Sequence, residues 1–327
     1  MTPRERFHAV MAYGAPDRAP LWAEGLREEV RQAWARQGLP LDTDLASLFE
    51  YDARQRLEVN LDPRPPLSHP PLTVSAIAQR RRHLDPRDPQ RLPGGPQGPA
   101  ALRQGSAAGQ LVELPLGHGL FLTLGVAAWA SFEPVLLQLA DAPALVGQVM
   151  QDQAAFTAEI ADTILGRVPV DFASFSEPIA DNHGPLISPA MFRDLVLPAY
   201  RPVLDVLRRH QVDPIVWVSY GNPRALLGQV LDAGFNCLWA IESESPEMDY
   251  RTLRRHFGRS LRLIGGIDLD CLRGGPAAID AELQAKVPPL LTAGGYVPLA
   301  DGRVRPNLPW AHYAYYRRQL QRLVCCG

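Results

Sequence analysis

The feature that most constrains the fold is a regular alternation of short apolar runs and longer amphipathic stretches, which begins near residue 110 and continues almost to the end of the chain. This rhythm is typical of parallel strands covered by their crossover helices. The expected strands are Leu111–Leu116, Val170–Phe175, Pro214–Ser219, Cys237–Ile241, Leu261–Ile267 and Tyr296–Leu299. The expected helices lie at residues 131–165, 189–210, 223–233, 249–257, 276–292 and 308–323.

Two short apolar segments nearer the N-terminus, Leu21–Ala23 and Leu57–Val59, supply candidates for two further strands. Together with the regular units they approach the strand number of an eight-stranded barrel. We therefore expect an α/β protein with a (β/α)8 TIM-barrel fold, built as one domain over residues 1–327. A doubly wound open sheet is the alternative, although the chain has no Gly-x-Gly-x-x-Gly turn of the kind that binds dinucleotides in such sheets.

The N-terminal third is less regular. Residues 2–12 predict a short helix with Thr2 as its cap, and residues 25–37 predict a second. Residues 63–99 hold ten of the 32 prolines, so we expect an irregular loop or lid there. The run Arg80–Arg82 inside it is either a solvated charge run or an anchor for an anionic substrate.

Composition narrows the classes of function. The 33 basic and 35 acidic side chains give a net charge of -2, which argues against a nucleic-acid partner. Only one lysine is present, Lys286, spaced for a helical ion pair with Glu282, so Schiff-base chemistry is not expected. Four scattered cysteines and the lack of an apolar leader predict a cytoplasmic protein. Residues 114–132 carry no formal charge, but Pro115 and Gly117 break the run, so no membrane span is expected.

Candidate site residues follow from the barrel, because reacting groups come from the carboxyl ends of the strands and the loops beyond them. We expect catalysis by Glu177, Tyr220, Glu242 and Asp301. Glu242 and Glu244 alternate around Ser243 and share one face if the strand continues, where like charges at close range raise the pKa of one of them, which suits general acid–base work. Tyr220 can donate a hydrogen bond to a substrate oxygen. Substrate binding is expected from Trp22, Glu24, His118, Ser219, Asn222, Glu244, Asp268 and Arg303.

A structural role stays open for several of these residues. Asp268 can stabilise the next turn, and Glu242 and Glu244 can bond to loop backbone. His118 lies between two glycines, where it can face solvent as readily as a ligand. Tyr220 can be a packing residue.

Several motifs in order resemble the uroporphyrinogen decarboxylase superfamily. The motifs are Thr2-Pro-Arg-Glu-Arg-Phe, Pro16-Asp-Arg-Ala-Pro20, Gly184-Pro-Leu-Ile-Ser-Pro-Ala-Met-Phe-Arg193 with Leu197-Pro-Ala-Tyr200, Gly265-Gly-Ile-Asp268, Gly294-Gly-Tyr-Val-Pro298 with Asp301, Asn307-Leu-Pro-Trp and Tyr313-x-x-Tyr316. This resemblance implies a distorted (β/α)8 barrel, often dimeric. Glu177 matches a glutamate that the family usually follows with aspartate, where this chain has Pro178.

The superfamily has at least two chemistries. Uroporphyrinogen decarboxylase itself needs no cofactor and binds its polycarboxylate substrate with an Arg-Gln-Ala-Gly-Arg stretch after the first strand. Here that place reads Glu24-Gly-Leu-Arg-Glu-Glu29, which is acidic, so porphyrinogen decarboxylation is not expected. The motifs are more similar to the cobamide-linked methyltransferases, and this branch implies a corrinoid carried on a partner protein.

The metal ligands of that branch are not matched. Its members use His-x-Cys, or His with an acid, after the middle strand, where this chain has Val218 and Tyr220. The last ligand position falls at Ala300 or Asp301. Since valine and alanine bind no metal, zinc is not expected. A replacement site for a hard metal from Glu177, Glu242 and Asp301 stays open.

The resemblance favours a methyltransferase-like enzyme that acts on a small organic substrate and lacks the usual His/Cys metal site. The first alternative is a metal-free decarboxylase or lyase whose substrate carboxylate is anchored by Arg303, Arg305 or Arg80–Arg82. The second alternative is a barrel that binds a ligand without catalysis.

Overall fold

The computed structural model describes residues 1–67, 72–93, 108–117, 119–126, 129–242 and 244–325. Contacts divide the chain into two compact units. The first unit comprises Met1–Arg54, Tyr220–Asn222 and Cys237–Gly327, and the second comprises Gln55–Ser219 and Pro223–Asn236. No helix in the described ranges has both the length and the apolar character that a membrane span requires.

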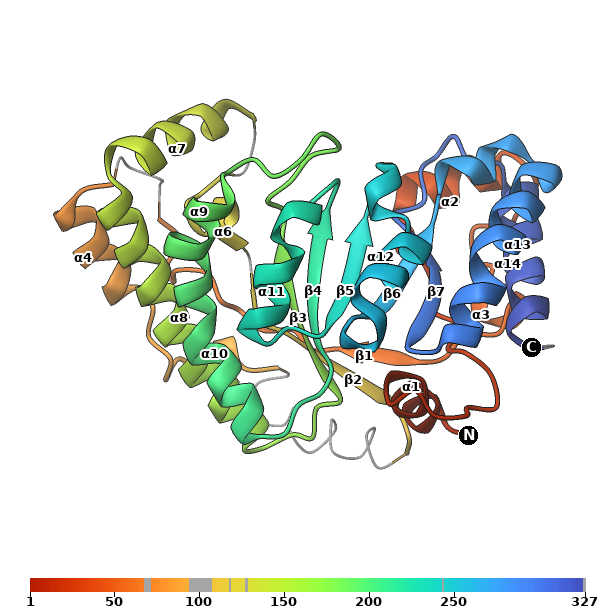
Figure 1. Ribbon diagram of the computed structural model, residues 1–327, viewed down its shortest axis with the longest axis horizontal. Helices are drawn as coiled ribbons and strands as arrows, with labels where there is room; N and C mark the ends of the chain where they lie inside the picture. Colours follow the sequence, from red (N-terminus) through yellow and green to blue (C-terminus); the bar gives the residue numbers. More distant parts are fainter. Residues whose placement is uncertain (68–71, 94–107, 118, 127–128, 243, 326–327) are drawn as a thin grey trace. The chain divides into compact units, whose positions relative to one another are not determined.

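The second unit contains parallel strands with helices packed beside them. Strand β3 pairs with β2 and with β4, and the register sets Glu113 against Phe172 and Glu177 against Ser219. Its long helices α8 and α10 lie side by side (Figure 1). The strands are β1 (Arg54–Arg56, at the boundary between the units), β2 (Leu111–Pro115), β3 (Phe172–Glu177) and β4 (Ile215–Tyr220), and the helices are α4 (Val74–Arg82), η1 (Pro89–Arg91), α6 (Gly119–Thr123), α7 (Trp129–Asp141), α8 (Pro143–Leu165), α9 (Pro189–Met191), η3 (Phe192–Val196), α10 (Leu197–Arg209), η4 (Arg224–Leu226) and α11 (Leu227–Ala233).

The first unit has the same design. Strand β6 pairs in parallel with β5 and β7, and α13 packs against α14 (Figure 1). The strands are β5 (Cys237–Ile241), β6 (Arg262–Ile267) and β7 (Tyr296–Ala300), and the helices are α1 (Pro3–Met11), α2 (Glu28–Ala35), α3 (Leu45–Leu48), η5 (Pro246–Met248), α12 (Tyr250–Phe257), η6 (Gly258–Ser260), η7 (Asp270–Gly274), α13 (Pro276–Ala293) and α14 (Trp310–Cys325).

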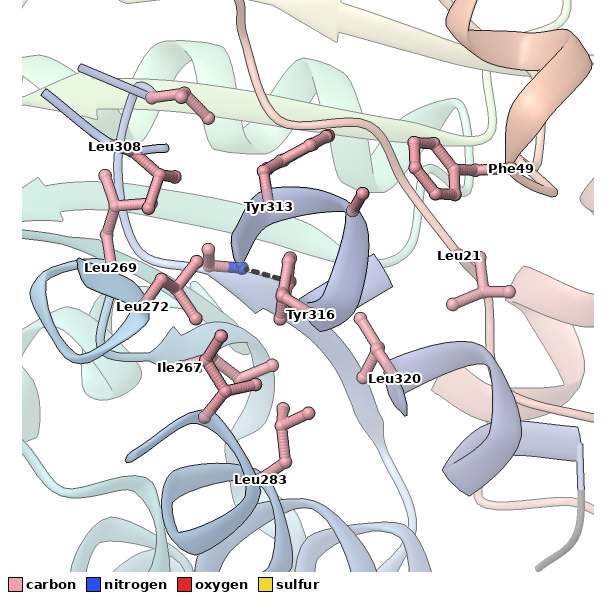
Figure 2. Packing of buried hydrophobic residues seen from close by; sticks show 14 of the residues in the cluster. Leu21, Phe49, Ile267, Leu269, Leu272, Leu283, Leu308, Tyr313, Tyr316 and Leu320 are labelled. Atoms are coloured by element: carbon pink, nitrogen blue, oxygen red, sulfur yellow. Dashed lines mark hydrogen bonds between the residues drawn. The ribbon is translucent and has the colours of Figure 1, made fainter. Parts of the chain in front are cut away.

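The core of the first unit joins β6 and β7 to the N-terminal segment. Leu21 and Phe49 approach α14, whose Tyr313, Tyr316 and Leu320 point into the same cluster (Figure 2). The Tyr316 hydroxyl also accepts a hydrogen bond from the Ala300 amide at 3.1 Å. Apolar packing and one buried polar contact therefore fix the end of β7, where candidate site residues follow.

The α/β fold class with parallel strands is confirmed, and each of the six strands expected after residue 110 is present within two residues of its expected ends. The helix after Thr2 is also confirmed, and its cap is a full capping box with Glu5. The predictions of two N-terminal strands were wrong. Leu21–Ala23 forms no strand, and the strand expected at Leu57–Val59 lies three residues earlier, at β1. The described residues contain seven strands, so an eight-stranded barrel is not confirmed.

The expectation that residues 63–99 are irregular was wrong in part. Helix α4 occupies Val74–Arg82, and the Thr73 side chain caps it by accepting a hydrogen bond from the Ala76 amide. A short 3-10 turn, η1, follows at Pro89–Arg91. The described prolines lie outside α4 or at the start of η1, so they are compatible with both elements. Residues 68–71 and 94–99 of this stretch lie outside the described residues.

Candidate functional site

Asp301 links the carboxyl ends of the strands in the first unit. Its side chain accepts a hydrogen bond from the Leu269 amide at 3.0 Å, after β6. Its own amide donates to the Ile267 carbonyl at 2.8 Å, and its carbonyl accepts from the Glu242 amide at 2.6 Å. Asp301 is buried, with 7% of its surface exposed. It positions the loops after β5 and β6.

Glu242 directly follows β5 and presents its side chain outward, with half of it exposed. Its φ of 51° lies in the left-handed region that side chains other than glycine rarely adopt. Such strain persists only where the surroundings impose it, and it is concentrated at functional sites. The Arg305 guanidinium donates to Oε1 of Glu242 at 3.1 Å, and this carboxylate raises the pKa of Arg305.

Glu242 and Arg303 line the same open pocket of about 450 Å³, which we call the arginine–glutamate pocket. It is lined by Arg27, Glu29, Glu242, Arg303, Val304, Arg305, Pro306 and Asn307. Arg27 pairs with Glu29 at 3.5 Å, and Arg305 pairs with Glu242. Among the described residues Arg303 has neither an ion pair nor a hydrogen bond. The pocket therefore carries one positive charge that no carboxylate of its wall matches.

Three further candidate residues of the first unit differ in whether their polar side-chain groups are bonded to the protein. Tyr220 ends β4 and is half-buried, and its hydroxyl has no hydrogen bond to any described residue. Glu244 is exposed. Asn222 is buried, and its side-chain amide donates to Glu247 at 3.1 Å. Tyr220 and Glu244 keep polar groups available to a ligand, whereas the Asn222 amide is held by the protein.

Glu24 and Trp22 lie inside the first unit. Both Glu24 oxygens accept hydrogen bonds, from the Tyr313 hydroxyl at 2.8 Å and the Tyr316 hydroxyl at 2.7 Å. The Arg317 guanidinium lies 3.4 Å from the same carboxylate and donates to the Trp22 carbonyl at 2.7 Å. The side chains of Glu24 and Arg317 are almost completely buried. These contacts explain the acidic residue at position 24 without a ligand.

Asp268 organises the turn after β6. Its Oδ1 accepts from the Asp270 amide at 2.8 Å, and its Oδ2 accepts from the Cys271 thiol at 3.1 Å. Burial, followed by the Asp268 hydrogen bond, raises the pKa of Cys271 to about 12. Cys271 therefore stays a thiol at neutral pH, and the structural alternative for Asp268 accounts for its contacts.

Glu177, at the end of β3 in the second unit, is completely buried. The Leu120 amide donates to Oε1 at 2.9 Å, and the Tyr200 hydroxyl donates to Oε2. A Cβ at Gly119, whose φ is 70°, would lie 2.4 Å from Oε1, so only glycine allows this approach. The Ser219 hydroxyl donates to the Glu177 carbonyl at 3.0 Å. Glu177 thus joins β3 to the start of α6, while His118 lies outside the described residues.

The titration of Glu177 gives a first prediction. Burial raises the pKa of Glu177 to about 7, from an ordinary value of 4.5. Between these pH values the folded chain keeps a proton that the unfolded chain has released. The free energy of unfolding should therefore fall as pH rises from 4.5 to 7, by up to about 3 kcal/mol from this group. Urea unfolding of Glu177→Gln at pH 5, 6 and 7 should show a flatter dependence than the parent. The exposed Glu159→Gln is the control, and an unchanged slope in Glu177→Gln would contradict the assignment.

The sequence interpretation missed a buried glutamate and a large cavity in the second unit. Glu113 accepts a hydrogen bond from the Ser174 hydroxyl at 2.6 Å, and Arg56 lies 3.4 Å from it. The available signal was a single glutamate in an otherwise apolar strand. A cavity of about 960 Å³ reaches from residues 56–62 to Gly117 and Ser176, at the ends of β2 and β3.

The positions that the resemblance assigns to metal ligands do not fit a zinc site. Val218 and Ala300 carry no donor atom, and one oxygen of Asp301 already accepts the Leu269 amide. Within the described ranges no three His, Cys, Asp or Glu side chains are grouped to hold a metal ion. Neither Glu177 oxygen is free of a protein donor.

Comparisons with known proteins give a family match and matches among solved structures. Residues 130–298 match the family model described as uroporphyrinogen decarboxylase (URO-D). Among solved structures, a methyltransferase from Methanosarcina mazei superimposes with a TM-score of 0.61 at 16% sequence identity, over 98% of this chain and 99% of the other. This likeness concerns the fold. No curated protein matches the sequence.

Proposed function

Because the chain belongs to the uroporphyrinogen decarboxylase family, we propose that it is an enzyme whose substrate is a small organic acid bound in the arginine–glutamate pocket. The observation that carries this proposal is Arg303, an arginine without a carboxylate partner among the described residues, on the wall that also presents Glu242. The pocket follows β5 and β7, at the strand ends where barrel enzymes place their reacting groups.

The pocket offers one group that can bind the acid and another that can transfer a proton. Arg303 offers a planar fork of N–H donors that matches a carboxylate. Glu242, held by Arg305, can accept or return a proton beside the bound acid. In a decarboxylation the carbon–carbon bond breaks, CO₂ leaves, and the carbon that keeps the electron pair gains a proton, which Glu242 would take up from solvent and deliver. Arg303 would therefore hold a second carboxylate, because pairing with the departing one would stabilise the ground state.

The proposed reaction requires no metal and no cobamide. We expect turnover of a panel of ¹³C-labelled di- and tricarboxylates, followed by NMR, to be the same before and after treatment with EDTA. Added cobalamin should also leave the rate unchanged. A rate that falls on chelation and returns with one metal would contradict a metal-free site, and elemental analysis of the purified chain would then identify the metal.

Methyl transfer is the second candidate, and the fold likeness to the Methanosarcina mazei methyltransferase supports it. In this alternative a corrinoid on a partner protein exchanges a methyl group with the substrate, and Tyr220, Glu242 and Asp301 of the first unit serve the transfer. The test is the absorbance change of methylcobalamin on demethylation in the presence of thiols and the chain. Demethylation that is lost in Tyr220→Phe and kept in Arg303→Gln would favour methyl transfer over the organic-acid proposal.

A further inference from the structure

Beside the cavity of about 960 Å³, the second unit has another cavity, of about 500 Å³, whose lining shares no residue with the arginine–glutamate pocket. Helices α4 and α8 contribute Ile77 and Val149 to its wall. Leu61, Leu72 and Leu122 continue the wall, so most of the surface is apolar. This volume is in the range of small-molecule sites, which are typically apolar with a few placed polar groups.

Arg80 of α4 is the single cation among the residues that line this apolar cavity. Its Nη2 donates to the side-chain oxygen of Gln153, and the Gln153 amide nitrogen donates to the Leu61 carbonyl at 2.9 Å. The second contact fixes which end of the amide faces Arg80. The Nη1 atom of Arg80 is buried and has no hydrogen-bond partner in the described part of the chain. The guanidinium is therefore held in place with a donor group left to satisfy.

Asp152 and Asp62 attract the charge of Arg80, but neither accepts a hydrogen bond from its Nη1. Asp152 accepts from Arg81 at 2.5 Å and from Gln148 at 3.0 Å. Asp62 is exposed and is the single anion of the cavity lining, so it disfavours a ligand with several negative charges. Burial lowers the pKa of Arg80, but an arginine stays protonated in proteins. A buried donor without an acceptor is costly, and a ligand with one carboxylate would remove that cost.

We propose that the apolar cavity binds a monocarboxylic acid with an apolar body, such as a medium-chain acid of about ten carbons. The carboxylate pairs with Arg80, and the chain lies against Ile77, Leu122 and Val149. The three arginines of the run Arg80–Arg82 therefore differ in exposure: Arg80 is half-buried, whereas Arg81 and Arg82 are exposed on the same helix. This binding site is independent of the function proposed for the first unit.

Isothermal titration with decanoate and with uncharged decanol tests the site. Decanoate should bind the parent chain more tightly than decanol does. Arg80→Gln should weaken decanoate by about tenfold or more and leave decanol unchanged, because it removes a charge-assisted hydrogen bond. Arg82→Gln, exposed on the same helix, is the matched control and should bind decanoate like the parent.

Two further variants keep the test decisive if Arg80→Gln folds poorly. Ala76→Phe places a ring at the cavity wall, retains Arg80, and should weaken both ligands. Arg303→Gln should bind decanoate normally, since that residue lines the arginine–glutamate pocket. Equal affinity for decanoate and decanol in the parent, or decanoate binding that survives Ala76→Phe, would overturn the proposal. Loss of decanoate binding in Arg303→Gln would likewise overturn it.

Discussion

Replacing Arg303 with glutamine is expected to weaken the binding of the acid substrate by about ten- to a hundredfold. The substitution keeps the polarity and approximate length of the side chain but removes the one charge of the arginine–glutamate pocket that no described carboxylate balances. A charge-assisted hydrogen bond to a carboxylate accounts for an effect of this size. The measurement is the substrate dissociation constant from isothermal titration, together with KM.

Two variants make this result specific. Arg318→Gln removes an exposed charge of α14 and should leave both constants unchanged. Glu242→Gln should lower kcat more than it raises KM, because Glu242 moves a proton while Arg303 holds the acid. An Arg303→Gln chain that binds and turns over the acid like the parent would contradict the proposed function.

The largest effect on stability is expected from Glu24→Ala, which should lower the free energy of unfolding by about 3–5 kcal/mol. The substitution leaves the buried Arg317 without its carboxylate, and it removes the acceptor of two buried tyrosine hydroxyls. The same substitution at Glu28, which is exposed on α2, should cost much less. Urea unfolding at neutral pH measures both values.

The outcome for Glu24 also separates two roles. If Glu24 serves the fold, Tyr313→Phe and Tyr316→Phe should each destabilise the chain to a smaller degree. A Glu24→Ala chain that is as stable as the parent but has lost substrate binding would contradict the structural role and restore the earlier expectation that Glu24 contacts substrate.

Much of the fold was predictable because the strands and helices after residue 110 express their periodicity locally. Polar residues and Gly-rich turns separate the runs, so β5 was placed to the residue and β7 within one. Leu21–Ala23 misled the interpretation because buried extended backbone has the same apolar pattern as a strand. Among the described residues the backbone of Leu21 is held by Asp52 alone: the Asp52 side chain accepts from the Leu21 amide at 2.7 Å, and the Asp52 amide donates to the Leu21 carbonyl at 2.8 Å, which is too little pairing for a strand. Family membership, expected from ordered motifs, is confirmed.

The site was less predictable than the fold. In the structure Glu242, Asp301 and Arg303 lie after neighbouring strands of the first unit, and their roles remain predictions. The sequence could not show which carboxylates already accept hydrogen bonds from other parts of the chain. Glu24 is bonded by tyrosines nearly three hundred residues away, and Glu177 by Tyr200. Such pairings depend on tertiary packing, which no local pattern encodes.

The central claim is that the arginine–glutamate pocket holds the substrate of this enzyme. The most direct test is a crystal structure of the chain with the acid that the turnover screen selects. We expect one carboxylate of the acid within hydrogen-bond distance of Arg303, with the reacting carbon beside Glu242. An acid bound in the large cavity at the ends of β2 and β3, with Arg303 facing solvent, would contradict the account.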